Sequence, residues 1–183
     1  LDRAGAGQVQ QQDDTPAANC SGGCSGSRIM ELLGDAEMRQ DAPANQEKPD
    51  SCLRQWPVQL HLINPDASYW QGAHLLIAAD CVPVAYGGFH SELLRGRHVI
   101  IACPKLDDTS PYVGKLADLL SRNSVKSVAV AHMEVPCCNG IRRLVDAAIA
   151  SARIEVDVED ICISIRGERL QGEANQEAKG ERR

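Results

Sequence analysis

The sequence predicts an α/β domain with an open, mostly parallel sheet and helices on both faces. Short apolar runs recur along the middle of the chain, at residues 74–80, 98–103 and 126–132. Such continuous runs are typical of parallel strands that are buried on both faces. Segments with the periodicity of amphipathic helices follow the second and third runs, at residues 112–123 and 140–152. Strands that alternate with helices form parallel sheets joined by right-handed crossovers.

The remaining elements follow from local patterns. Residues 58–63 alternate between apolar and polar side chains, so they are expected to form a first strand. A short helix is predicted near 89–96 and ends at Gly96. Residues 28–33 are expected to form a helical turn, and residues 160–166 the strand that closes the sheet. The apolar face of the helix at 112–123 is expected to contain Val113, Leu116, Leu119 and Leu120.

Length and composition fit one domain with loose ends. The chain has 183 residues, of which 43% are hydrophobic, enough for a single core. Residues 1–19 and 170–183 are polar without periodicity and are expected to be disordered. This leaves 20–169 as the domain, with a polar linker near 34–51.

Charge and hydropathy exclude several classes of protein. The net charge of -6 argues against a general nucleic-acid binder, which would carry a basic face. The longest apolar stretch is broken by Asp80 and is too short to span a membrane. The N-terminal segment has no apolar core of a signal peptide, so a cytoplasmic location is expected. The first residue is not Met, and we expect residue 1 to begin a fragment of a longer chain.

Eight cysteines carry the functional signal of the sequence: Cys20, Cys24, Cys52, Cys81, Cys103, Cys137, Cys138 and Cys162. Since no export signal is visible, metal binding or redox chemistry is favoured over disulfide bonds. Cysteines follow or end each of the three central strands, at Cys81, at Cys103 and at the pair Cys137 and Cys138. Ligands of open α/β sheets bind at the carboxyl ends of the strands. We therefore expect these thiols to share one metal site, although a single cysteine at a strand end is more often core filler.

The glycine-rich loop "CSGGC" could cover this site and add a ligand. Of its two thiols, Cys24 is the better candidate, and Cys20 could replace a ligand or bind an extra iron. Sets of four thiolates hold either tetrahedral zinc or an iron–sulfur cluster, and the thiolates alone do not choose between them. Both Cys137 and Cys138 can reach one centre only if the backbone is irregular, as Pro136 and Gly140 would allow. Cys52 and Cys162 are interpreted as structural.

Several polar neighbours have a structural and a functional interpretation. His132 is expected to be a hydrogen-bonded histidine at a strand end rather than a metal ligand, and Glu134 a loop acid rather than a general base. Asp80 could orient a ligand or cap the following turn. The paired acids of "CPKLDD" are expected to hold Lys105 or the turn itself. No glycine-rich phosphate loop is present, which makes a nucleotide-dependent enzyme an unfavoured interpretation.

Several long phrases resemble ferredoxin-type 4Fe–4S iron–sulfur proteins of anaerobic bacteria and archaea. These phrases are "QWPVQLHLINP", "GAHLLIAADCVPVAY", "FHSELLRGRHVIIACPKLDD" and "HMEVPCCNG", within a match over about 24–167. "CSGS" at 24–27 is similar to the family's C-P-G-S element, with Ser25 in place of proline. The resemblance implies a 4Fe–4S cluster held by Cys24, Cys81, Cys103 and one or both of Cys137 and Cys138. It also implies electron transfer to a redox partner protein or to an N-terminal ferredoxin module, whose C-x-x-C-x-x-C runs do not occur in this sequence.

A weaker likeness connects "SVKSVAVAHMEVPCCNGIRRLV" with the strand, histidine, cysteine and helix of β-class carbonic anhydrases. It implies an alternative zinc lyase or hydrolase with Cys81, His132 and Cys137 as ligands. The Asp–Arg pair of that family has no match here, and His132 lies five residues from Cys137. "PCCNG" also resembles the CCG element of heterodisulfide-reductase-type subunits, without their later C-x-x-C. A third alternative is a structural domain stapled by zinc, and the sequence leaves a homo-oligomer open.

Overall fold

The computed structural model describes residues 29–31 and 50–170. The strands of these residues are β1 (Met30–Glu31), β2 (Gln55–Trp56), β3 (His74–Ala79), β4 (His98–Ala102), β5 (Ser127–Met133), β6 (Val158–Ile163) and β7 (Arg169–Leu170). The α-helices are α1 (Val82–Ala85), α2 (Tyr112–Arg122) and α3 (Asn139–Ala152). Shorter helical turns are η3 (Ser68–Trp70), the π-helical η4 (Phe89–Leu94) and η5 (Pro136–Cys138).

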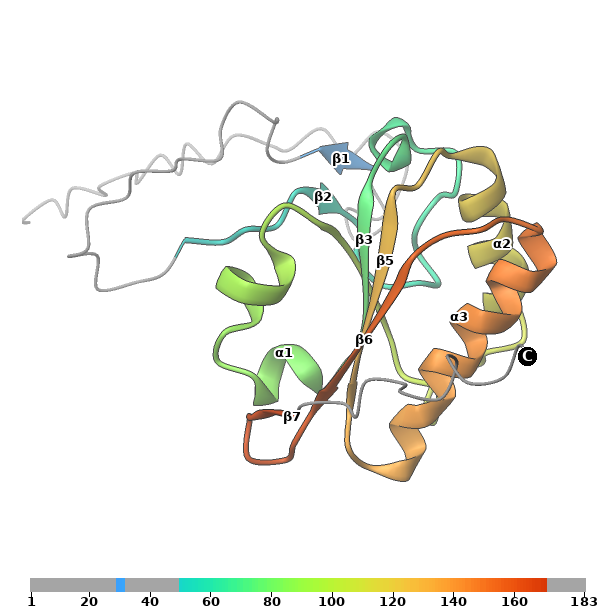
Figure 1. The fold of residues 1–183 in the computed structure, drawn as a ribbon. Helices are drawn as coiled ribbons and strands as arrows, with labels where there is room; N and C mark the ends of the chain where they lie inside the picture. The colour runs from blue at the N-terminus through green and yellow to red at the C-terminus, as the bar shows by residue number, and fades with distance from the viewer. Residues whose placement is uncertain (1–28, 32–49, 171–183) are drawn as a thin grey trace, which may run out of the picture.

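The main sheet has the strand order β4-β3-β5-β6-β7. Its first four strands are mutually parallel, and β7 pairs antiparallel with the end of β6 as a short hairpin. Figure 1 shows α1 on one side of this sheet and α2 and α3 on the other. The predicted fold class, an open and mostly parallel sheet with helices on both faces, is therefore confirmed.

The chain reverses its direction of winding between β3 and β5. From β3 it passes through α1 and η4 to β4, on one flank of the sheet. From β5 it passes through α3 to β6, on the other flank. Neighbouring strands whose following helices leave toward opposite faces define a topological switch point, where open α/β sheets bind ligands. In this sheet the switch point lies between the carboxyl ends of β3 and β5.

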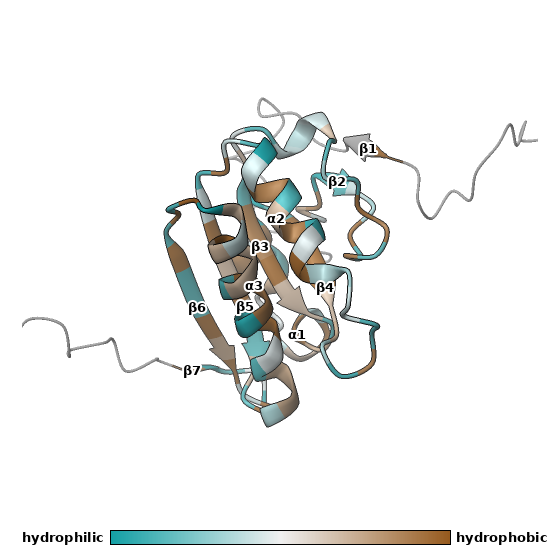
Figure 2. Cartoon of the chain, turned by 90° about the vertical axis from the view of Figure 1, so that its right-hand side faces the viewer, coloured by the Kyte–Doolittle hydropathy of each residue, from teal (hydrophilic) through white to brown (hydrophobic). Residues whose placement is uncertain are grey.

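The core forms because the central strands are apolar on both of their faces. Every residue of β3 after His74 is buried, and in β5 every residue after Ser127 is buried. Figure 2 shows these strands in the brown of apolar residues, behind helices that carry both apolar and polar faces. Trp70, fully buried, seals the core beside the start of β3 and donates its indole N–H to the Asn64 carbonyl oxygen at 2.8 Å.

The predicted strand at 58–63 is wrong. This segment makes only one isolated bridge, from Gln59 to Ile101, and then turns, with the Leu62 N–H donating to the Gln59 carbonyl oxygen at 2.8 Å. Pro57 supplies no N–H, so a regular ladder cannot extend from β2 into this segment. The short stretch at 58–60 nevertheless lies beside β4, where the Ile101 N–H donates to the Val58 carbonyl oxygen.

Other boundaries differ by smaller amounts. Met30 and Glu31 pair with β2 as a strand, so the helical turn predicted there is wrong at these two residues. The helix predicted near 89–96 is a π-helical turn that ends at Leu94. The closing strand ends at Ile163, since residues 164–168 form the turn into β7. The segments 1–19, 34–49 and 171–183 lie outside the described residues.

None of the helices in residues 29–31 and 50–170 is long and apolar enough to cross a membrane.

Candidate functional site

The thiols predicted to share a site lie at one edge of the sheet. Cys81 follows β3 by two residues and precedes α1, and Cys103 directly follows β4. Cys137 and Cys138 form the end of η5, just past β5. Because β3 lies between β4 and β5 and all three are parallel, their carboxyl ends are neighbours, about 4.8 Å apart from strand to strand.

At the switch point, Cys138 lies near enough to the thiols of Cys137 and Cys81 for their charges to act on it. The pKa of the Cys138 thiol is raised, first by burial and further by the neighbouring thiols of Cys137 and Cys81. A hydrogen bond with the main chain of Met133 acts in the opposite direction. Cys81 and Cys137 are exposed, whereas Cys138 is only 5% exposed. The site thus presents two accessible thiols above a buried one.

The irregular turn expected at Pro136 explains how adjacent cysteines occupy different environments. Val135 is extended, Pro136 begins a 3-10 turn, and this turn leads directly into α3. Successive side chains of a 3-10 turn point about 120° apart. Cys138 therefore packs into the core while Cys137 faces solvent. Both lie at the amino end of α3.

Cys103 is positioned by a side-chain clamp at Asp107. The Oδ2 atom of Asp107 accepts hydrogen bonds from the Cys103 main-chain N–H at 2.8 Å, the Tyr112 hydroxyl at 2.5 Å and the Gln59 amide at 3.1 Å. Burial alone would raise the pKa of Asp107, but the three hydrogen bonds outweigh it and lower the pKa. The carboxylate of Asp107 thus ties the turn after β4 to α2 and to the segment before β3.

A second carboxyl group, that of Asp80, directly precedes Cys81 and lies near enough to Asp107 to be affected by its charge. Burial, and then the charge of Asp107, raise the pKa of Asp80. The expectation that the acids of "CPKLDD" hold the turn is confirmed for Asp107, and Asp108 accepts from the Ser110 N–H at 3.1 Å. Tyr112 and Gln59 complete the clamp and were not anticipated, since their contacts are made only by the tertiary fold.

The turn after β4 also lies against the start of α3. A Cβ atom at Gly140 would come within 3.0 Å of Pro104 Cβ, closer than nearly all real contacts of this kind. Gly140 therefore permits Pro104, and with it the turn that carries Cys103, to approach the turn that carries Cys137 and Cys138. The turns after β4 and β5 therefore lie against each other.

His132 and Glu134 have structural partners. His132 is buried, its Nδ1 lies 3.0 Å from the Met133 carbonyl oxygen, and its Nε2 lies 3.4 Å from Asp160 Oδ1. Glu134 accepts a hydrogen bond from the Ile165 main-chain N–H at 2.8 Å, which holds the β6–β7 turn beside the end of β5. The structural interpretation of both residues fits this arrangement.

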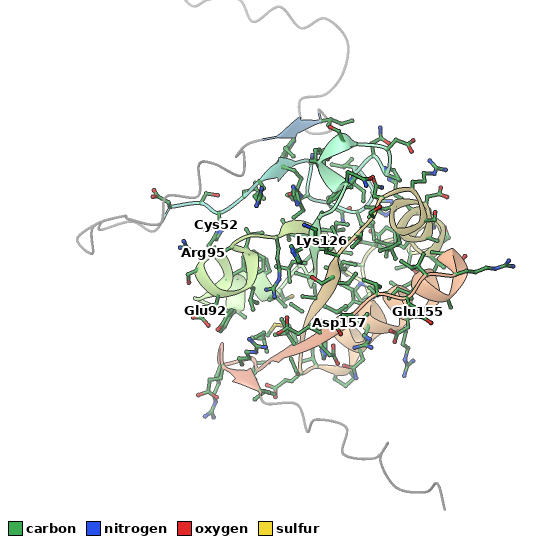
Figure 3. All side chains as sticks on the ribbon, turned by 45° about the horizontal axis from the view of Figure 1, so that its top comes forward. Cys52, Glu92, Arg95, Lys126, Glu155 and Asp157 are labelled. Atoms are coloured by element: carbon green, nitrogen blue, oxygen red, sulfur yellow. The ribbon has the colours of Figure 1, made fainter. Side chains whose placement is uncertain are left out.

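The other cysteines contribute differently. Cys20 and Cys24 lie outside the described residues. Cys52 donates its main-chain N–H to His90 Nδ1 at 3.1 Å, and Figure 3 shows it near Arg95 and Glu92, on the η4 side of the sheet. Cys162 lies within β6, and burial raises the pKa of its thiol, followed by the charges of Glu134 and Asp160. All six described cysteines are free thiols.

Across residues 29–31 and 50–170, no three or more His, Cys, Asp or Glu side chains are arranged as a ready-made metal site. The structure brings Cys81, Cys137 and Cys138 together and places Cys103 on the next strand end. Metal binding by these residues stays a prediction.

Comparison with known proteins agrees with the topology. A family model described as a Rossmann-like domain matches residues 67–180, well over half of the chain. The chain belongs to this Rossmann-like domain family. It is also similar to a protein of Archaeoglobus fulgidus described as uncharacterized, with 28% identity over 115 residues, which cover 63% of this chain and 81% of the relative. No solved structure matches the chain.

The Rossmann-like match begins shortly before β3 and includes the switch point with all four thiols of the carboxyl edge. The family is named for its fold, and a fold of this kind hosts many unrelated functions. A functional conclusion must therefore come from the residues at the edge.

Proposed function

We propose that this Rossmann-like protein binds an iron–sulfur cluster through thiols at the carboxyl edge of its sheet and acts in electron transfer. One observation carries the proposal: Cys81 and Cys138 follow neighbouring parallel strands at the switch point, Cys137 adjoins Cys138, and both of these thiols act electrostatically on Cys138. Switch points are where this class of sheet binds its ligands, and clustered thiolates select soft metals and iron–sulfur clusters.

The donor set fits such a cluster in kind and nearly in number. Iron–sulfur clusters are usually held by four cysteine thiolates. The switch point supplies three, and Cys103 or Cys24 would supply the fourth, with Cys20 as an additional thiol. The resemblance of the sequence to ferredoxin-type 4Fe–4S proteins supports the same assignment. When bound, the cluster would supply one-electron transfer.

The residues of the edge would control access and potential. Burial of Cys138 excludes water from one side of the thiol group, and solvent exposure of an iron–sulfur cluster is one of the factors that set its potential. Cys81 and Cys137, which are exposed, would form the side through which electrons leave. The amino end of α3 would stabilise the negative charge of the thiolates.

A redox partner protein would have to approach this edge. Three of the most exposed large apolar side chains surround it, with exposures of 88% for Val84, 82% for Leu106 and 70% for Ile165. They follow β3, β4 and β6, each at its carboxyl end. Exposed apolar side chains around a site are typical of surfaces that bind other proteins.

The zinc alternatives have less support. A lyase site would need a ring nitrogen of His132, and both nitrogens face other partners, the Met133 carbonyl oxygen and Asp160. A structural zinc staple is typical of small domains that cannot build a core, whereas this domain buries a continuous apolar core around β3 and β5. Iron–sulfur binding is therefore the better proposal.

The test is anaerobic purification of the chain, with iron and acid-labile sulfide analysis and an electron paramagnetic resonance spectrum after reduction. We expect iron and sulfide in equal amounts and a reduced-cluster signal. Cys81→Ser, Cys137→Ser and Cys138→Ser should each lose most of the iron. Cys52→Ser and Cys162→Ser are matched controls away from the switch point and should keep it.

Two results would contradict the proposal. A colourless protein that carries zinc and no sulfide under these conditions would favour a zinc site. Full iron content in all three edge variants would show that the cluster, if present, is held elsewhere.

A further inference from the structure

A pocket with a volume of about 240 Å³ opens beside the thiol site, between the turn after β4 and the first half of α3. Its walls are formed by Pro104, Thr109, Gly140, Arg143, Leu144 and Ala147. Pro104 directly follows Cys103, and Gly140 lies two residues after Cys138. The pocket therefore adjoins the candidate thiol site, but none of its lining residues belongs to that site.

The pocket carries a positive charge that no acid of the described residues neutralises. Arg143 is exposed and makes no ion pair or hydrogen bond within residues 29–31 and 50–170. Its neighbour Arg142 forms the ion pairs instead, with its Nε 2.9 Å from Asp146 Oδ1 and its Nη1 3.7 Å from Asp160 Oδ1. A lone guanidinium beside a cavity is suited to bind a carboxylate or another planar anion through two parallel hydrogen bonds.

The acidic side chains of the turn after β4, on the other side of the pocket, are hydrogen-bonded to other partners. Asp107 is engaged by Cys103, Tyr112 and Gln59, and Asp108 accepts from the Ser110 N–H. The amino end of α3, a helix of 14 residues, adds a further positive potential at Gly140. The electrostatics of the pocket are therefore those of an anion site.

The remaining walls are apolar. Pro104, Leu144 and Ala147 present hydrocarbon surface, and Thr109 adds one hydroxyl group. Pockets that hold drug-sized ligands measure roughly 300–1,000 Å³, so the occupant of this pocket must be smaller. A ligand with a small hydrocarbon part against the apolar wall and one anionic group against Arg143 would match the pocket in shape and charge.

We propose that this pocket binds a small organic monoanion, an aliphatic or aromatic carboxylate, with its anionic group on Arg143 and its hydrocarbon part against Leu144 and Ala147. The inference uses no thiol and does not depend on the proposed iron–sulfur cluster. A bound anion would nevertheless lie next to the thiol site, because Pro104 and Gly140 belong to both neighbourhoods.

The experiment is a titration of the isotopically labelled full chain with benzoate, with butyrate as an aliphatic carboxylate and benzamide as a neutral analogue of benzoate. Amide shifts in two-dimensional NMR spectra report the affinity and the place of binding together. We expect saturable shifts at Gly140, Arg143 and Ala147 with a carboxylate. Benzamide should bind at least about tenfold more weakly, the equivalent of about 1.4 kcal/mol.

Variants separate charge from shape. Arg143→Gln should reduce benzoate affinity to that of benzamide, whereas Arg143→Lys should retain part of the difference. Arg95→Gln removes an exposed cation from the end of η4, on the other side of the sheet, and should change nothing. Ala147→Leu fills the pocket from an exposed helical position, so it should block binding without loss of the fold.

Three results would overturn the inference: no saturable shifts with either carboxylate, shifts confined to other surfaces, or equal benzoate affinity in Arg143→Gln and in the unaltered chain. The spectrum of each variant without ligand shows whether it is folded. The metal analyses of the cysteine variants test the cluster separately, so failure of one proposal does not imply failure of the other.

Discussion

Removal of the Asp107 carboxylate should destabilise the domain and release the turn that carries Cys103. This carboxylate is the common acceptor for three donors from separate segments, the Cys103 N–H, the Tyr112 hydroxyl and the Gln59 amide. In Asp107→Ala all three donors lose their partner at once. The thiol of Cys103 would then no longer be held at the carboxyl edge by its own turn.

The magnitude follows from the burial of the donors. Tyr112 is completely buried, so its hydroxyl group finds no replacement in water. A buried donor left without a partner costs about 1–3 kcal/mol, and the half-buried Cys103 amide adds a similar or smaller amount. The Gln59 amide can turn to solvent. We therefore expect Asp107→Ala to lower the free energy of unfolding by about 2–4 kcal/mol, or Tm by roughly 6–16 °C for a domain of this size.

The assay is urea unfolding at neutral pH, monitored by tryptophan fluorescence and circular dichroism. Asp108→Ala is the matched control, because this neighbouring carboxylate is exposed and accepts hydrogen bonds only from the nearby Ser110. It should cost within about 0.5 kcal/mol. Equal effects of the two substitutions would refute the clamp.

The pH dependence gives the clamp a second signature. Hydrogen bonds lower the pKa of Asp107 in the folded state, despite its burial. Its charged form therefore contributes stability above the ordinary aspartate pKa of about 3.9, and that contribution is lost as the pH falls through the lowered value. The difference in unfolding free energy between the unaltered chain and Asp107→Ala should accordingly narrow in acid, and a difference that grew would contradict the assignment.

Three further results are expected from the described residues. Gly167→Ala should lower the free energy of unfolding by about 1–3 kcal/mol, because the φ of Gly167 is +80° and a Cβ there would lie 2.3 Å from the Ala85 carbonyl oxygen. Gly87 has open space around it, so Gly87→Ala should be nearly neutral in the same urea assay. In an ultraviolet pH titration no tyrosine should ionise near pH 10 while the protein is folded, because burial raises the pKa of Tyr69 to about 12 and the pKa values of the other two tyrosines are raised as well. An early step at pH 10 without unfolding would contradict this. In the metal-free protein, alkylation should modify Cys137 before Cys138, as measured by mass spectrometry. The reason is that the Cys137 thiol is exposed, whereas burial raises the pKa of the Cys138 thiol. Equal rates of alkylation would contradict the orientation of η5.

Most of the sheet could be predicted because its central strands carry their signal locally. Continuous apolar runs at 74–79 and 127–133 are required wherever a strand is covered on both faces, and the structure buries nearly all of these residues. The helix α3 begins within one residue of its expected start. Even the end of α2 was anticipated, with Asn123 at the C-cap, although Val113 of its predicted apolar face is only half-buried.

The errors arise where tertiary contacts replace a local pattern. Residues 58–63 alternate in hydropathy for reasons unrelated to a ladder: Leu60 is buried in the core, while the neighbouring Gln59 side chain reaches Asp107. Such contacts join residues that are 48 positions apart, and no periodicity reveals them. The Asp107 clamp was partly visible as an acid pair after a strand, but its donors were not.

The thiols of the carboxyl edge also differ in whether the sheet or a single side chain holds them in place. Cys81 and Cys138 follow neighbouring parallel strands that are paired residue by residue, so the sheet itself sets their approach. Cys103 depends in addition on a side chain, Asp107, that can be removed without loss of a strand. Any ligand that needs the first two thiols should therefore tolerate changes in the turn after β4, whereas a ligand that also needs Cys103 should be lost with the clamp. Asp107→Ala in the metal-binding assay consequently tells whether Cys103 is a ligand or only a neighbour: retained iron would mean that the fourth thiolate comes from elsewhere in the chain.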